Sequence, residues 1–447
     1  MKNHLKNIYS ILLYKLLFWA ALSLIALSTY SCSEPASPFG QTDITLSALD
    51  ASCTEVWLEL KFSNLSQPAD VAIQKDGKDY LRLLSLNRDT LLVFEDLEPS
   101  TNYSFCAIIR HEGKDDKISN TAEVRTMDTT NHSFTWEVFE FGEGLASSAF
   151  YDIAYISEND IWVVGEIYFN DTYTYDTLGN YIQPYNAVHW DGLKWERKQM
   201  FYKTTAGPSF RPIHSLYAIN KDEIWFGNFV QFKNGAINSL NLNISFPALV
   251  NGIWAASSTE VYIVGGGGRI AKHSGYSWEI IPSGTEFDLH DINSNSEGRV
   301  LIAGGFYLRN IGGIILKKNG TVFEKVLTFP ESKEVMSIAP IGKFKTLTVG
   351  AGIFQSNDNL ANWKELLISN SYSSVVRANS HNQIAIAGHF SSFLYFNGVR
   401  WQDKSEIGFP EIPRTIWKSI AINTNEVILI GMATENNKAI ILRGKIG

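Results

Sequence analysis

The stretch "FTWEVFEFGEG", Phe134–Gly144, has the form of the closing part of a repeat whose beginning is missing. Its Trp-Glu pair is similar to pairs further along the chain, in "KWERK" (Lys194–Lys198), "SWEII" (Ser277–Ile281) and "RWQDK" (Arg400–Lys404). Each of those later segments closes a longer unit, whereas this first segment precedes all of them. Its position is explained by the way the longer units are arranged.

Seven segments each consist of a short apolar strand that ends at a glycine: Gly165, Gly227, Gly265, Gly304, Gly350, Gly388 and Gly431. Another short strand precedes each one across a polar turn. A third strand, a turn and in most copies an aromatic fourth strand follow, as in "HWDGLKWE" (His189–Glu196). Most of these glycines lie about forty residues apart, the length of a four-stranded propeller blade. The sequence therefore predicts an all-β chain with a seven-bladed β-propeller over residues 132–447.

The seventh copy has no fourth strand of its own, because "AIILRGKIG" (Ala439–Gly447) is the last segment of the sequence. A propeller has to pair its last blade with its first or leave sheet edges open. We expect residues 132–141 to supply the outer strand of the last blade from the N-terminal side. This arrangement is the velcro closure seen in many propellers.

One copy resembles a known family motif. "SNDNLANW" (Ser356–Trp363) is similar to the Asp-box, Ser-x-Asp-x-Gly-x-x-Trp, with Leu360 in the place of the glycine. The C-terminal two-thirds of the chain thus resembles the BNR/Asp-box propellers, which include sialidases, sortilin-type receptors and photosystem assembly factors. The resemblance implies that this box is a hairpin on the rim, remote from the binding face.

The region 43–128 contains alternating strands of a smaller domain. In "VWLELKF" (Val56–Phe62) apolar residues occupy every second position. "LEPSTNYSFCAII" (Leu97–Ile109) resembles the signature of fibronectin type III domains, in which Tyr103 would form the tyrosine corner. The resemblance implies a small sandwich that serves as a spacer or an adhesive module.

The first 42 residues have the pattern of an export signal and a tether. Lys2, Lys6 and Lys15 precede the apolar run of residues 16–27, and "LSTYSC" ends at Cys32. This end resembles a bacterial lipobox, although Thr29 replaces the usual aliphatic residue. We expect a signal peptide at 1–31, an acylated Cys32 that anchors the chain to a lipid bilayer, and a tether at 32–42. The expected location is the outer membrane or the cell surface, with the periplasm as the alternative.

Two further cysteines, Cys53 and Cys106, lie in the smaller domain. An oxidising compartment permits a disulfide between them. The alternation of the strand places Cys106 on its outward face, which makes a meeting with Cys53 difficult. The sequence leaves both arrangements open.

The net charge of −8, from 38 basic and 46 acidic residues, argues against a nucleic-acid partner. Propellers usually bind ligands where the inner strands begin. Aligning the repeats places two rings of residues there. The first ring is Tyr151, His214, Asn251, His290, Met336, Ser374 and Lys418, and the second is Asp152, Ser215, Gly252, Asp291, Ser337, Val375 and Ser419. Of these, we expect Tyr151, His214, His290 and Asp291 to contact a ligand.

Two of these histidines and two of these aspartates, His214, His290, Asp152 and Asp291, could hold a metal through nitrogen and oxygen ligands. No His-x-His or His-x-x-x-His spacing supports such a site. We therefore expect neither a metal nor a cofactor.

A tyrosine-rich insertion follows the second strand of the first repeat, over Glu166–Val188. Tyrosine offers a large contact area with a polar end, which suits sugar stacking or a protein interface. The insertion can equally be an extended hairpin that packs on its neighbour. The candidate contact residues are Tyr168, Tyr173, Tyr175, Tyr181 and Tyr185.

The sequence favours a non-catalytic binding protein that recognises a protein or a glycan at the cell envelope through the propeller face. A sialidase-like hydrolase is one alternative, but none of the arginines that could grip a substrate carboxylate (Arg211, Arg269, Arg299, Arg309, Arg377 and Arg414) lies in a matching motif. An envelope assembly scaffold is the other alternative. The sequence predicts no catalytic residue.

Overall fold

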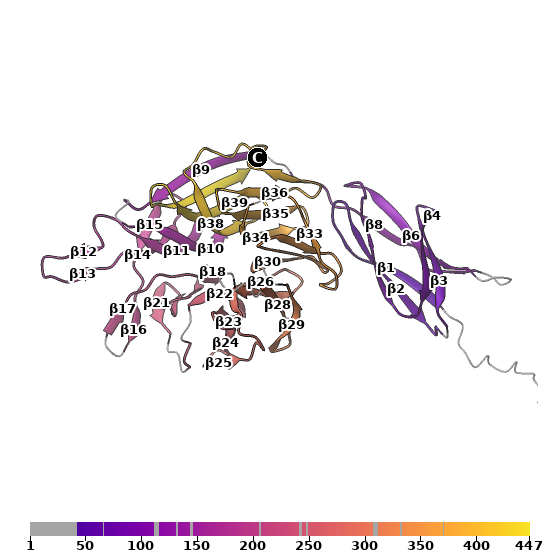
Figure 1. Ribbon diagram of the computed structural model, residues 1–447, viewed down its shortest axis with the longest axis horizontal. Helices are drawn as coiled ribbons and strands as arrows, with labels where there is room; N and C mark the ends of the chain where they lie inside the picture. Colours follow the sequence, from indigo (N-terminus) through magenta and orange to yellow (C-terminus); the bar gives the residue numbers. More distant parts are fainter. Residues whose placement is uncertain are drawn as a thin grey trace, which may run out of the picture. The chain divides into compact units, whose positions relative to one another are not determined.

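The computed structural model describes residues 43–65, 67–110, 116–130, 133–143, 146–204, 207–240, 244–246, 249–306, 312–330, 333–369 and 371–447 (Figure 1). Every regular element in these residues is a β-strand. The predicted signal peptide, the tether and Cys32 lie outside the described residues. Among the described residues there is no helix whose length and apolar character would let it traverse a bilayer.

The chain divides into two compact units, each made of several segments of the sequence. Among the described residues, one comprises 43–46 together with Leu60–Thr90 and Phe105–Thr121. The other comprises Ser47–Glu59, Leu91–Ser104 and Ala122–Gly447.

The strands before residue 128 form two sheets. A three-stranded sheet has the order β1 (Asp43–Ala51), β2 (Val56–Ser63), β5 (Thr90–Phe94). A five-stranded sheet has the order β4 (Lys78–Leu86), β3 (Ala69–Lys75), β6 (Asn102–Ile109), β7 (Lys117–Ile118), with β8 (Ala122–Arg125) also paired to β6. The hydroxyl of Tyr103 accepts a hydrogen bond from the Glu98 backbone N–H at 2.9 Å, which is the bond expected of a tyrosine corner.

Cys53 and Cys106 are both free thiols, so the disulfide that the sequence left open is absent. Cys53 is buried, and its Sγ lies 3.0 Å from the Asp128 carbonyl oxygen, to which it donates a hydrogen bond. Burial raises the pKa of Cys53 to about 11. Burial also raises the pKa of Cys106. Both groups therefore stay protonated and weakly reactive at neutral pH.

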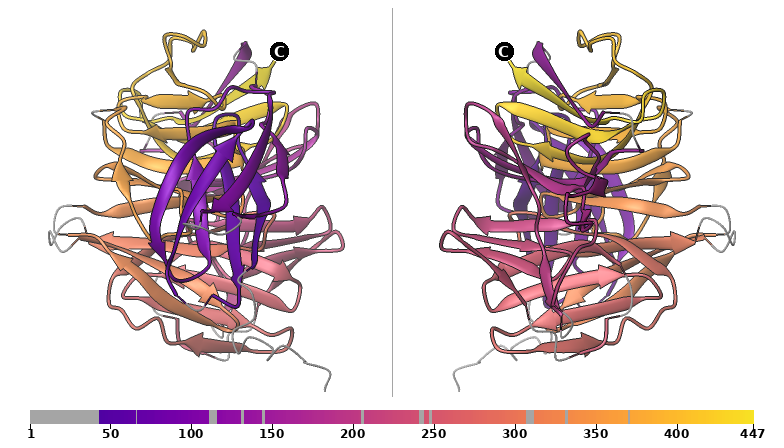
Figure 2. Two further views of the ribbon diagram at one scale, coloured as in Figure 1. Left: turned by 90° about the vertical axis from the view of Figure 1, so that its right-hand side faces the viewer. Right: turned by 90° about the vertical axis from the view of Figure 1, so that its left-hand side faces the viewer.

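The rest of the described chain forms seven four-stranded antiparallel sheets, which follow one another in chain order (Figure 2). From the inner to the outer strand, the first three are β10 (Ala149–Ser157), β11 (Asp160–Ile167), β14 (Tyr185–Trp190), β15 (Trp195–Lys198); β18 (Leu216–Asn220), β19 (Glu223–Phe226), β20 (Val230–Lys233), β21 (Ala236–Ser239); and β22 (Val250–Ser257), β23 (Glu260–Gly265), β24 (Arg269–His273), β25 (Trp278–Ile281). Two short hairpins, β12 (Thr174–Tyr175) with β13 (Tyr181–Ile182) and β16 (Tyr202–Thr204) with β17 (Gly207–Ser209), lie outside these sheets.

The fourth to seventh sheets repeat the pattern. They are β26 (Asp288–Ser294), β27 (Val300–Phe306), β28 (Gly312–Asn319), β29 (Val322–Thr328); β30 (Val335–Ile341), β31 (Lys345–Gly350), β32 (Ile353–Ser356), β33 (Lys364–Glu365); β34 (Ser373–Ser380), β35 (Gln383–Gly388), β36 (Phe393–Phe396), β37 (Trp401–Asp403); and β38 (Thr415–Ile422), β39 (Glu426–Ala433), β40 (Ala439–Ile446), β9 (Phe134–Phe141). The inner strands contact one another in this order, and β38 also contacts β10.

The stretch "FTWEVFEF" forms β9, which pairs with the C-terminal strand β40 (Figure 1). Phe141 lies opposite Ala439, and the pairing runs without a break to Phe134 opposite Ile446. Trp136 Nε1 donates a hydrogen bond to the Ile407 carbonyl oxygen at 3.2 Å. β9 therefore holds the outer position of the seventh sheet.

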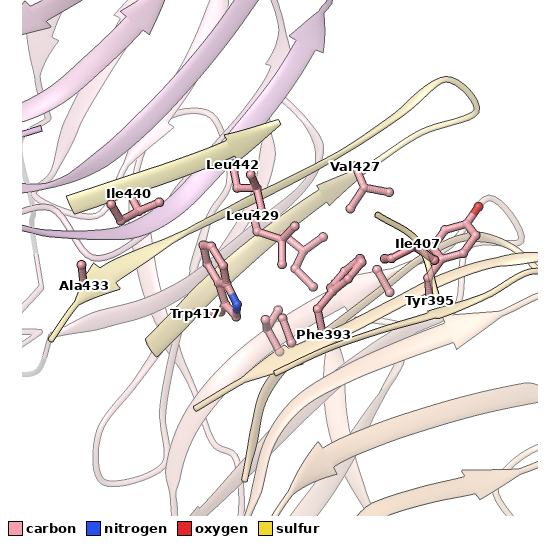
Figure 3. Close-up of a cluster of buried hydrophobic side chains, with 13 residues drawn as sticks. Phe393, Tyr395, Ile407, Trp417, Val427, Leu429, Ala433, Ile440 and Leu442 are labelled. Carbon is pink, nitrogen blue, oxygen red and sulfur yellow. The ribbon is translucent and has the colours of Figure 1, made fainter. Parts of the chain in front are cut away.

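Apolar clusters fill the spaces between neighbouring sheets. Figure 3 shows the cluster between the sixth and seventh sheets, where Phe393 and Tyr395 face Trp417, Leu429 and Leu442. A similar cluster joins the seventh sheet to the first and contains Ile428, Ile430, Ile441, Phe150 and Val163. The apolar residues of the repeat thus become the contact between one sheet and the next, and this contact includes the last sheet with the first.

The segment that resembles an Asp-box forms the hairpin between β32 and β33. The Ser356 hydroxyl donates to Asp358 at 3.0 Å, and Asp358 also accepts the Asn362 backbone N–H at 2.9 Å. Leu360 is buried and has a φ of 76°, a region that favours glycine. The hairpin therefore keeps a backbone suited to glycine although leucine occupies the position.

Candidate functional site

The repeated glycines shape the start of the inner strands. Gly165 on β11 pairs with Phe150 on β10, and the register then skips Tyr151 so that Val164 pairs with Asp152. A Cβ atom on Gly165 would overlap the Ala149 carbonyl oxygen. Glycine is therefore needed where the bulge brings the two backbones together, and the bulge redirects the side chain of the skipped residue.

The same bulge recurs in the third to seventh sheets. In each of them the register skips one residue of the inner strand. A Cβ on the repeated glycine would overlap the backbone carbonyl oxygen of the residue two positions before the skipped one. The skipped residues are Asn251, His290, Met336, Ser374 and Lys418. In the second sheet His214 precedes β18, and Gly227 N–H donates to the Ser215 carbonyl oxygen at 2.8 Å.

All seven residues of the first predicted ring line one cavity of about 620 Å³. The cavity runs along the inner strands, with Ser294 and Asn423 among its lining residues near the other strand ends. The second predicted ring lines it as well, with the exception of Ser215. Its size is that of a typical ligand pocket. Among the sequence-predicted contacts, Tyr151, His214, His290 and Asp291 lie here, and their role as ligand contacts stays a prediction.

Asp291 is committed to an ion pair. Its two carboxylate oxygens accept hydrogen bonds from Arg377, Nη1 at 2.8 Å and Nη2 at 3.1 Å. The Ser337 hydroxyl donates to the same carboxylate at 2.6 Å and the Ile338 N–H at 3.1 Å. Burial opposes the charge of Arg377, but Asp291 outweighs it and the pKa of Arg377 is raised. Asp291 therefore ties the fourth sheet to the fifth and sixth.

Asp152 has a similar structural role on the opposite side. Its carboxylate accepts the Leu216 N–H at 3.0 Å and the Ser419 hydroxyl at 2.8 Å, so it joins the first sheet to the second and the seventh. Burial raises the pKa of Asp152 to about 6, against the opposing effects of the Leu216 bond and of the Arg377 charge. At neutral pH this carboxyl is mostly ionised, with its oxygens already occupied.

The cavity side that carries Lys418 has a different character. The Tyr151 ring stacks on His214, with centroids 4.3 Å apart. Lys418 is exposed inside the cavity. Burial lowers the pKa of Lys418, and burial with the charge of Lys418 lowers the pKa of His214 and of His389. Lys418 in β38 and His214 just before β18 therefore lie close enough on this side of the cavity for the charge of the lysine to act on the imidazole.

The side that carries His290 also holds a carboxylate. His290 Nε2 lies 3.5 Å from a carboxylate oxygen of Glu334 and 3.2 Å from the Gly305 carbonyl oxygen. The Tyr372 hydroxyl donates to Glu334 at 2.8 Å. A buried carboxylate therefore accompanies the histidine on this side.

The predicted tyrosine-rich insertion forms the β12–β13 hairpin, which projects beyond the sheets in Figure 1. It leaves β11 at Ile167, at the same strand ends as Tyr151, since Ala149 pairs with Glu166. Tyr173 and Tyr175 each contact Tyr181 edge to face, at 6.0 and 5.5 Å. Tyr173, Tyr175 and Tyr181 are exposed.

The five candidate tyrosines do not line the cavity. Tyr168 packs edge to face on Tyr173 at 4.8 Å, and burial raises its pKa. Tyr185 donates a hydrogen bond to Asp171 at 3.0 Å and lies under the Arg197 guanidinium. The structure therefore separates the predicted contacts into two groups, the cavity residues and a hairpin on the same face.

Sequence reasoning selected Asp291 but missed its partner Arg377, which it had considered only for a substrate carboxylate. Among the described arginines, Arg377 alone lines the cavity. The sequence did contain a signal for this pair. Arg377 lies two residues after Val375, the second-ring residue of the same strand, and strand alternation therefore places both on the same face. In the described part of the chain, no three His, Cys, Asp or Glu side chains gather as metal ligands.

The chain was compared with known proteins. No model of a protein family and no curated protein matches it. Among solved structures, YCF48 bound to D1 peptide is similar at 15% identity with a TM-score of 0.51, over 71% of this chain and 99% of that chain.

YCF48 from Cyanidioschyzon merolae is similar at 12% identity with a TM-score of 0.47, over 68% of this chain and 98% of that chain. The WD40 β-propeller domain of Doa1 is similar at 12% identity with the same TM-score, over 69% and 96%. The fold is a β-propeller. At these identities the likeness concerns the fold alone.

Proposed function

We propose that the chain is a non-catalytic binding protein that recognises a protein partner through the face on which the inner propeller strands begin. The observation that carries this proposal is a set of six bulges, which direct six side chains into one cavity that His214 also lines. Six glycines permit the close backbone approach at these bulges.

A peptide segment suits the shape and chemistry of this cavity. Its volume of about 620 Å³ accommodates a few side chains. Its lining combines a ring pair, Tyr151 with His214, with amide, thioether and ammonium groups of Asn251, Met336 and Lys418. YCF48, which has this fold, has been solved with a D1 peptide bound, and this supports testing peptides first. A glycan partner would use the same face.

The tyrosine hairpin extends this contact surface. Tyr173, Tyr175 and Tyr181 are exposed beside the strand ends that carry Tyr151. Exposed tyrosines contribute large contact areas at low entropic cost. We assign them to the outer part of the partner's footprint.

We also propose no catalytic role. The one described arginine in the cavity, Arg377, is already paired with Asp291 on both of its terminal nitrogens. Gripping a substrate carboxylate in the manner of a sialidase needs several converging arginines, which this arrangement does not offer.

The proposed architecture is a seven-bladed propeller over 132–447 that β9 closes, preceded by a fibronectin type III-like sandwich over 43–128. The β9–β40 pairing, the cluster between the seventh and first sheets and the Tyr103 bond support it.

We further propose that the chain is exported, with residues 1–31 removed, Cys32 acylated and 32–42 as a tether. It would then act at the outer membrane or cell surface, or in the periplasm.

Selection from a phage-displayed library of short linear peptides on the full-length protein tests the proposed function. The selected peptides are then measured against Met336→Trp, which fills the cavity, and Val399→Trp, a control at an exposed turn. We expect at least about tenfold weaker binding to the first variant and unchanged binding to the second. Peptides that bind both variants as they bind the wild type would refute the cavity face as the binding site.

A further inference from the structure

Lys418 lines the cavity where β38 begins, and none of the described residues is its partner. It occupies the bulge of β38, between Trp417 and Ser419 in the register, and its side chain lines the cavity. Within the described part of the chain it makes no hydrogen bond and no ion pair. The groups that sense its charge are His214 and His389, whose pKa values it lowers. Among the described residues, no carboxylate thus forms an ion pair with this lysine.

The acidic groups of the cavity are committed elsewhere. Asp291 accepts two bonds from Arg377 and two more from Ser337 and Ile338. Asp152 accepts bonds from Leu216, Ser419 and its own neighbour Ile153. Neither carboxylate can turn to Lys418 without leaving a buried donor unsatisfied, which costs about 1–3 kcal/mol for each lost bond.

Glu334 does not compensate Lys418 either. It is held by Tyr372 at 2.8 Å and faces His290 at 3.5 Å, on the side of the fourth and fifth sheets. Lys418 belongs to the seventh sheet, beside Tyr151 and His214 of the first two. The excess positive charge is therefore confined to one side of the mouth.

We propose that this side of the mouth is a carboxylate-binding subsite, in which Lys418 forms an ion pair with an acidic group of the bound peptide. This inference rests on the proposed function and names the chemistry of the partner. The Tyr151–His214 ring pair provides a flat wall beside the ammonium group. A charge-assisted bond inside a cavity is stronger than one on an open surface, because less water competes for it.

An acidic side chain and a C-terminal carboxylate would both supply this chemistry. One selected peptide is therefore synthesised in four forms, with its acidic residues intact or changed to the amides, and with a free or an amidated C-terminus. Binding is measured to the full-length wild type, to Lys418→Gln, to Lys418→Arg and to the control Lys221→Gln. Lys221 is an exposed lysine that pairs with Asp222 in the β18–β19 turn.

We expect at least about tenfold weaker binding to Lys418→Gln, largely restored binding to Lys418→Arg, and no change in the control. The peptide that lacks the decisive carboxylate should bind the wild type and Lys418→Gln equally, which identifies the acidic side chain or the C-terminus as the source. Peptides that need the cavity but bind Lys418→Gln as well as the wild type would overturn this inference and leave the proposed function standing. If no peptide depends on the cavity, the proposed function itself fails.

Discussion

At the scale of single residues, Asp152 and Asp291 each join neighbouring propeller sheets around the cavity through hydrogen bonds. Asp291 is fully paired with Arg377, whereas Asp152 is held by one backbone N–H and one hydroxyl of neighbouring sheets. The difference in their partners predicts a difference in how each responds to mutation and to pH.

Arg377→Ala should destabilise the protein by about 3 kcal/mol, because it leaves the carboxylate of Asp291 buried without its counter-ion. The matched control is Arg82→Ala, which breaks the exposed ion pair with Asp70 (3.2 Å) and should cost less than about 1 kcal/mol. Urea unfolding of the full-length protein measures both. Equal small losses would show that the Asp291 pair contributes nothing beyond a surface pair.

Asp152 should make stability fall as the pH rises from about 4 to about 6. Its native pKa of about 6 lies above the value for an unfolded chain, so the native state binds the proton more tightly. The contribution is full below the unfolded pKa and is lost as the pH rises through about 6, by about 3 kcal/mol in total.

Asp152→Asn removes this titration. The difference in unfolding free energy between wild type and variant should therefore change between pH 4 and pH 6.5, and urea titrations at these pH values measure it. A difference that stays constant across this range would contradict the assignment.

At the scale of elements, the bulge is the feature that directs one side chain into the cavity in six of the seven sheets. The strand pattern alone predicts where inner strands begin, and the glycine near the end of the second strand marks the position beside each bulge. In the sixth sheet Gly388 faces Ser373, and a Cβ on it would overlap the Tyr372 carbonyl oxygen.

Gly388→Ala should destabilise the protein by about 2–3 kcal/mol, because backbone atoms have to move to make room for the methyl group. Gly447→Ala is the control, since its added Cβ would meet Ser133 only at 3.6 Å or more. Thermal unfolding compares the two. If both variants unfold at the same temperature as the wild type, the close backbone approach does not require glycine.

Replacing the hairpin Tyr173–Ile182 by a short glycine-serine turn should weaken binding of the selected peptides or of a larger partner by about tenfold, because it removes three exposed tyrosines. Stability should change little, since these rings contribute to none of the apolar clusters between the sheets. Retained affinity in the shortened protein would remove the tyrosines from the contact surface.

At the scale of the whole molecule, the sequence pattern predicted the sheets better than it predicted the chemistry. The repeat located each four-stranded sheet, and the Trp-Glu pair of β9 indicated the pairing with β40. The alignment of strand starts also identified the residues around the cavity.

What sequence reasoning could not supply was the set of contacts between distant strands. The Asp291–Arg377 pair joins residues of the fourth and sixth sheets, and Cys53 donates a hydrogen bond to the carbonyl oxygen of Asp128, 75 residues further along the chain. The absence of a partner for Lys418 among the described residues likewise appears only when the contacts of Asp152, Asp291 and Glu334 are known. No periodicity in the chain reports such pairings.

Hydrogen exchange of the full-length protein, with and without a selected peptide, tests the central claim most directly. We expect slower exchange where the inner strands begin, over residues 149–152, 214–216, 250–252, 288–291, 335–337, 373–375 and 415–419, and in the tyrosine hairpin. Protection confined to the outer strands or to residues 43–128, with these segments unchanged, would contradict the assignment of this face as the binding site.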